Sequence, residues 1–69
     1  MKAIGRYIII SEIKEDIRYR TADVISVGTA VEGVNIKDKI YYDRHAGHNI
    51  EIGKDIYKVI QEQDVIIVL

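Results

Sequence analysis

The C-terminal thirteen residues, 57–69, constrain the fold more than any other part of the chain. They form two short apolar segments, 57–60 and 65–69, separated by a polar turn at 61–64. Successive side chains of a β-strand point to opposite faces, so an unbroken apolar run predicts a strand that is covered on both faces. The run is far too short to cross a bilayer. An uncovered terminal strand promotes aggregation, so we expect another copy of the chain to cover it.

The length of 69 residues predicts a single domain over 1–69. A chain of this size buries only about 60% of its unfolded surface, so such domains often depend on disulfides, a metal or oligomerisation. The sequence has no cysteine, which excludes disulfides and thiolate metal sites. Oligomerisation is therefore the expected source of additional stability.

The charge balance predicts an ordinary soluble protein. Charged residues make up 30% of the chain and the net charge is -1. Such a chain has no bulk attraction to nucleic acid or to an anionic membrane, and we expect neither as a partner. No apolar segment with a cleavage site follows Met1 and Lys2. Together with the missing cysteine, this predicts a cytoplasmic protein.

The apolar residues indicate an all-β fold. Isoleucine and valine supply most of them, Leu69 is the sole leucine, and Phe and Trp are absent. Such β-branched residues favour strands over helices. Alternation and turn signals predict strands at 7–13, 18–27, 39–42, 50–52, 56–60 and 65–69. Charged or polar turns are expected at 14–16, 37–38, 53–55 and 61–64, and a loop at 43–49. Short strands at such close spacing predict a small barrel or sandwich.

One helical alternative exists, over residues 55–65. Ile56, Val59 and Ile60 are spaced three and four apart, as on one face of a helix. The β-branched side chains argue against it, and only Asp55 is available as an N-cap.

Several segments follow one another in an order that is typical of a known family. Residues 22–28 (ADVISVG) form a strand that ends in a Val-Gly pair, and residues 34–42 (VNIKDKIYY) follow a V-K-x-G-D-x-V-x-F pattern in which Asp38 and Tyr42 take the matching positions. In this order the chain resembles the co-chaperonin family, whose bacterial member is GroES.

The two ends of the chain extend the resemblance. Residues 57–68 are similar to the family's closing stretch, with Asp64 as the aspartate of its polar turn, and residues 6–10 are similar to its first strand. Each motif is a generic β pattern, so the inference depends on their serial order over most of the chain. The resemblance implies a small, partly open β-barrel of the GroES type.

The resemblance also implies a ring assembly, in the family a heptamer, in which the first strand of one subunit pairs with the last strand of the next. Such a head-to-tail interface closes into a ring when the rotation per subunit allows it. Burying Ile66 and Val68 in it would contribute roughly 3–6 kcal/mol per contact. The subunit-interface candidates are Ile4, Tyr7, Ile9, Val65, Ile66, Ile67, Val68 and Leu69.

The chain departs from the family pattern at its two appendages. The family has a long, Gly-rich loop after the first strand, which carries an aliphatic anchor for the chaperonin; here only residues 14–21 fill that place. The family's roof hairpin is reduced to residues 29–35, and Lys37 replaces a turn glycine. The chaperonin-contact candidates in the shortened loop are Ile17, Arg18 and Tyr19. Ile17 either packs onto the barrel or is presented to a partner.

A hard-ligand metal site at Asp43, His45, His48 and Glu51 is the one metal hypothesis. Zinc requires three or four converging ligands, and this spacing fits a solvated loop equally well. We expect no metal and no cofactor.

Catalysis is not indicated. Ser11 and Ser26 lie within predicted strands, and no Ser-His-acid arrangement or Gly-rich phosphate loop is present. We expect a protein that is not an enzyme.

Residues 18–20 (Arg-Tyr-Arg) form the only cluster that combines basic and aromatic side chains, as in barrels that bind single strands. Glu15 and Asp16 lie beside it, and the chain has no net positive charge. The leading hypothesis is a co-chaperonin-like ring that caps or modulates a chaperonin chamber. An adaptor ring that does not bind a chaperonin is the alternative, and a nucleic-acid-binding barrel is weaker.

Overall fold

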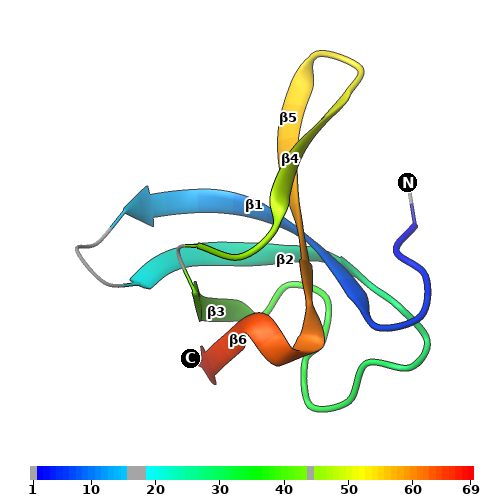
Figure 1. Cartoon of the computed structure of the whole chain (residues 1–69), viewed down its shortest axis with the longest axis vertical. Coiled ribbons are helices and arrows are strands. Elements are labelled where there is room, and N and C mark those ends of the chain that lie inside the picture. The colour runs from blue at the N-terminus through cyan, green and yellow to red at the C-terminus, as the bar shows by residue number, and fades with distance from the viewer. Residues whose placement is uncertain (1, 16–18, 44) are drawn as a thin grey trace.

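The computed structural model describes residues 2–15, 19–43 and 45–69, which contain a six-stranded sheet (Figure 1). The strands are β1 (Tyr7–Glu15), β2 (Tyr19–Val27), β3 (Lys39–Asp43), β4 (His48–Ile52), β5 (Asp55–Gln61) and β6 (Val65–Val68). Their order in the sheet is β4-β5-β1-β2-β3-β6, and every pairing is antiparallel. The sheet curls without closing, so the prediction of an all-β, partly open barrel is confirmed.

The helical alternative over residues 55–65 is wrong. Asp55–Gln61 forms β5, and only Glu62–Asp64 makes a short 3-10 turn before β6. The backbone N–H of Gln61 donates to Oδ2 of Asp64 at 2.9 Å, which closes this turn. The β-branched side chains of the segment favour the extended form, and Ile60 is buried in the core.

The core follows the alternation of the central strands. Ile8 and Ile10 of β1 point inward and are fully buried, while Tyr7 on the other face is 47% exposed. Directly opposite residues of paired strands share a face, so Val24 and Ile60 lie beside the two isoleucines. The buried cluster consists of Ile8, Ile10, Ala22, Val24, Val34, Ile40, Tyr42 and Ile60.

The predicted turn at residues 14–16 is wrong for its first two residues. Lys14 pairs with Thr21 and Glu15 pairs with Arg20, so the β1–β2 ladder extends almost to its connection. Tertiary pairing has overridden the local preference of charged residues for turns. Residues 14–15 and 19–21, where the resemblance implies part of a loop, are here paired backbone.

The β4–β5 hairpin projects away from the other strands (Figure 1). β1 pairs with β5 only over residues 7–10, and beyond this point β5 pairs with β4 instead. The loop predicted at 43–49 is accordingly shorter than expected, because Asp43 ends β3 while His48 and Asn49 begin β4. The part of the hairpin beyond this point therefore extends out of the barrel, and the other strands pack against it only in part.

Candidate functional site

The terminal strand β6 forms one edge of the sheet. It pairs with β3 through Ile40↔Val68 and Tyr41↔Ile67, and its other side has no strand partner among the described residues. The exposed fractions on this edge are 45% for Ile66, 49% for Ile67, 40% for Val68 and 59% for Leu69. Val65 packs against the core. Four consecutive exposed apolar residues on an open edge make a strand-pairing surface.

The N-terminal segment, residues 2–6, is held against the chain's own sheet. The backbone N–H of Ala3 donates to Oγ of Ser26 at 3.0 Å, and Ala3 is 5% exposed. Ile9 pairs opposite Ser26 and is 6% exposed in the single chain. Ile4 is 76% exposed. Of the interface candidates in the first part of the chain, Ile4 and Tyr7 are therefore accessible and Ile9 is not.

The Val-Gly pair at residues 27–28 has a steric explanation in this segment. A Cβ on Gly28 would overlap the carbonyl oxygen and carbon of Gly5, which crosses directly above it. The Ala30 N–H donates to the same Gly5 carbonyl oxygen at 3.0 Å. Glycine at position 28 is what allows the N-terminal segment to approach this closely.

Of the chaperonin-contact candidates, only Tyr19 falls within the described residues. It begins β2 and pairs with Asp43 of β3. Ile17 and Arg18 lie outside the described residues. The three candidates remain predictions.

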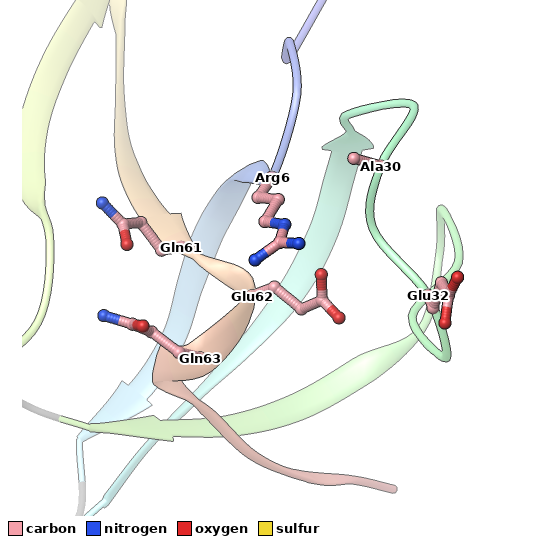
Figure 2. A pocket seen from close by; sticks show the side chains of 6 residues that line it. All are labelled: Arg6, Ala30, Glu32, Gln61, Glu62 and Gln63. Atoms are coloured by element: carbon pink, nitrogen blue, oxygen red, sulfur yellow. The ribbon is translucent and has the colours of Figure 1, made fainter.

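A polar pocket of about 420 Å³ lies between the start of β1, the loop after β2 and the turn before β6 (Figure 2). It is lined by Arg6, Ala30, Glu32, Gln61, Glu62 and Gln63. The backbone N–H of Glu62 donates to the carbonyl oxygen of Arg6 at 3.0 Å, which joins two of its walls. Figure 2 shows the Arg6 guanidinium above the turn and the Glu62 carboxylate directed toward the loop that carries Glu32. Ligand pockets are usually mainly apolar, so this one suits water and charged groups better than an apolar ligand.

The four residues of the metal hypothesis lie on separate elements. The backbone N–H of His45 donates to Oδ1 of Asp43 at 2.9 Å, within the turn after β3. His48 and Glu51 lie on β4. Among the described residues, no three His, Asp or Glu side chains converge as metal ligands would.

The sequence reasoning missed the apolar hairpin tip. Ile52 is 38% exposed and Ile56 is 68% exposed, on either side of the turn at Gly53 and Lys54. Both residues were assigned to strands, but alternation alone does not show that the hairpin extends beyond the core. The one sequence signal for an exposed tip is that Ile52 and Ile56 flank a short turn and lie on opposite faces of the hairpin, so that one face of the sheet cannot bury both.

Comparison with known proteins supports one family. The Chaperonin 10 Kd subunit family matches residues 3–69. A search of individually curated proteins finds no significant match. Within the described ranges, no helix is long and apolar enough to span a membrane. The family match covers all six strands in order, and the chain therefore belongs to the Chaperonin 10 Kd subunit family, the co-chaperonins.

Proposed function

We propose that the chain assembles into a homo-oligomeric ring and caps or modulates the folding chamber of a GroEL-type chaperonin. Membership of the co-chaperonin family supports both parts. The observation that carries the assembly is the open edge of β6, with Ile66, Ile67 and Val68 all at least 40% exposed. A heptamer is the stoichiometry that the family resemblance implies. No catalytic step is required of such a cap.

The neighbour's pairing segment is the N-terminal stretch before Tyr7. Over residues 7–10, β1 is already flanked by β2 and β5. Residues 2–6 belong to no strand within the chain, and Ile4 is largely exposed. Pairing of this segment with β6 of the next copy would cover the open edge at the cost of rearranging the Ala3–Ser26 hydrogen bond.

The test of the function is capture by a chaperonin in the presence of nucleotide. We expect the wild-type chain to be retained and Ile17→Asp to be lost, because a charge would disfavour docking in an apolar groove. Ile36→Asp is the matched control, since Ile36 is an exposed isoleucine on a different loop. Multivalent contact in a ring can convert a weak single docking segment into measurable retention. Failure of the wild-type chain to be captured would reject the chaperonin role.

One observation favours an adaptor ring as the second candidate. The β1–β2 ladder extends to Glu15↔Arg20, which leaves only residues 16–19 between paired positions. A connection this short presents few side chains to a partner. An oligomer that forms normally and is never retained by a chaperonin would favour this alternative.

A further inference from the structure

The β4–β5 hairpin carries apolar side chains that its own chain leaves open. Cross-strand partners share a face, so Ile50 and Tyr57 lie together, and Ile52 and Val59 continue the same face by alternation. We call these four residues the outer hairpin face. The opposite face carries the buried Lys58 and Ile60 at its base and the exposed Ile56 near the tip.

The described chain covers this face only in part, and least at Ile52 near the tip of the hairpin. Among the described residues, β4 has β5 as its only strand neighbour. An isolated two-stranded hairpin is marginally stable in water. Ile50, Tyr57 and Val59 are partly exposed and Ile52 is 38% exposed. A covering partner would therefore stabilise the hairpin as well as bind it.

A hollow lies at the base of the outer hairpin face. It has a volume of about 140 Å³, and both apolar and polar residues line it: Tyr7, Gly47, His48, Val59, Ile60, Gln61 and Asp64. The hollow connects the start of β1 with the hairpin, because Tyr7 and Val59 are diagonal neighbours on one face.

The terminal strand alone is too small to hold a ring together. At about 25 cal/mol per Å², complete burial of an aliphatic side chain removes roughly 60–120 Å² from water. The four exposed residues of the β6 edge are about half exposed, so they offer on the order of 200 Å². A stable interface buries about 800 Å² per partner. The N-terminal segment of the neighbouring copy supplies only part of the missing buried area. The surface that contacts β6 must therefore include further residues of that copy.

We propose that the outer hairpin face binds the apolar C-terminal strand β6 of a second copy. The interface between the two subunits would then extend from the N-terminal segment of the receiving copy along its β4–β5 hairpin. A closed ring needs two different surfaces, and β4 and β6 are the opposite edges of the sheet. Both surfaces are mainly apolar, and a net charge of -1 opposes self-association only weakly. This inference rests on the ring assembly in the proposed function.

Engineered disulfides test the proposal directly, because the chain has no cysteine of its own. The double variant Ile52→Cys/Ile67→Cys places one thiol on each proposed surface. On mild oxidation at micromolar concentration we expect a ladder of covalent oligomers on a non-reducing gel. The control, Ile56→Cys/Ile67→Cys, carries the hairpin thiol on the opposite face and should remain mainly monomeric on the gel. Equal cross-linking of both variants, or of neither, would overturn the proposal.

A charge series gives a second readout that needs no disulfide geometry. Ile52→Lys should raise the concentration needed for assembly by about tenfold, which corresponds to the loss of about 1.4 kcal/mol of apolar burial. Ile56→Lys should leave assembly unchanged, and circular dichroism should show both variants folded. If wild type assembles and Ile52→Lys assembles equally well, the proposal fails while the ring stands. If wild type remains monomeric, the proposal and the ring fail together, and chaperonin capture reports separately on the partner. Loss of capture by Ile52→Lys with assembly intact would assign the face to the chaperonin and contradict the proposal.

Discussion

At the residue scale, two positions show how backbone geometry selects a side chain. Lys37 has φ = 76°, and it is the only non-glycine residue with positive φ in the described ranges. The left-handed region costs an L-residue roughly 1–2 kcal/mol. The turn remains closed because the Lys37 N–H donates to the Val24 carbonyl at 2.9 Å and Asp38 accepts from the Asn35 N–H at 2.9 Å. This explains why the co-chaperonin pattern has glycine at this position.

We predict that Lys37→Gly stabilises the fold by about 1 kcal/mol, because glycine adopts positive φ without steric cost. Urea unfolding monitored by circular dichroism would measure the change as a higher midpoint. Lys39→Gly is the control, since Lys39 is an exposed strand residue without positive φ, and it should lower the midpoint. A Lys37→Gly midpoint at or below wild type would contradict the prediction.

Gly28 is a glycine for lack of space rather than for its φ. A Cβ there would overlap Gly5, whereas a Cβ on Gly53 meets nothing within 4 Å although its φ is +64°. We predict that Gly28→Ala destabilises the fold by more than about 2 kcal/mol through overpacking, and Gly53→Ala by only about 1 kcal/mol. The free energies of unfolding of the two variants, measured side by side, test the order. The reverse order would show that the N-terminal segment does not cross Gly28 in solution.

At the element scale, the strands that alternate around a buried core were predictable and the others were less so. Ile8 and Ile10 alternate with Tyr7 and Ile9, so β1 could be assigned from sequence. The burial of Ile9 could not, because alternation places it on the same face as the exposed Tyr7. The extent of β4 and the ends of the β1–β2 ladder were also missed, since in both cases cross-strand pairing outweighs local composition.

The exposed edge of β6 was predictable to a similar degree, while its role as an interface remains a prediction. The apolar run of β6 indicated a surface that needs covering, and the exposed fractions of Ile66 to Leu69 show where it is open. The hairpin face was not identified, because its residues look like core residues in sequence. Only the projection of the hairpin beyond the core, visible in Figure 1, separates them.

The β1–β2 connection is the element on which the proposed chaperonin binding would depend. Glu15 and Arg20 are directly paired, so residues 16–19 can be replaced by Asn-Gly, which suits a two-residue hairpin turn. We predict that the shortened chain unfolds within about 1 kcal/mol of wild type, because it loses the Tyr19–Asp43 pair at the end of β2 but no residue of the buried cluster. It should assemble normally and lose retention on a chaperonin. Retention at the wild-type level would show that residues 16–19 are not the docking segment.

At the scale of the whole molecule, the small core and the open edge lead us to expect that folding and assembly depend on each other. The buried cluster is small, and four consecutive residues at the end of the chain are at least 40% exposed. A domain of this size has a marginal core, so we expect association to add a large share of its stability. Anything that binds only the folded chain raises its apparent stability by mass action, and a second copy is no exception.

We therefore predict that the Tm of the wild-type chain rises with protein concentration. A tenfold increase is worth about 1.2 kcal/mol per subunit in a large ring, which corresponds to roughly 5–10 °C for a domain of this size. Ile67→Asp places a charge on the open edge and should give a lower Tm that does not depend on concentration. Differential scanning calorimetry over a hundredfold concentration range measures both chains. A wild-type Tm that is constant over this range would show that the single chain supports its own fold, and that β6 tolerates water on its open side.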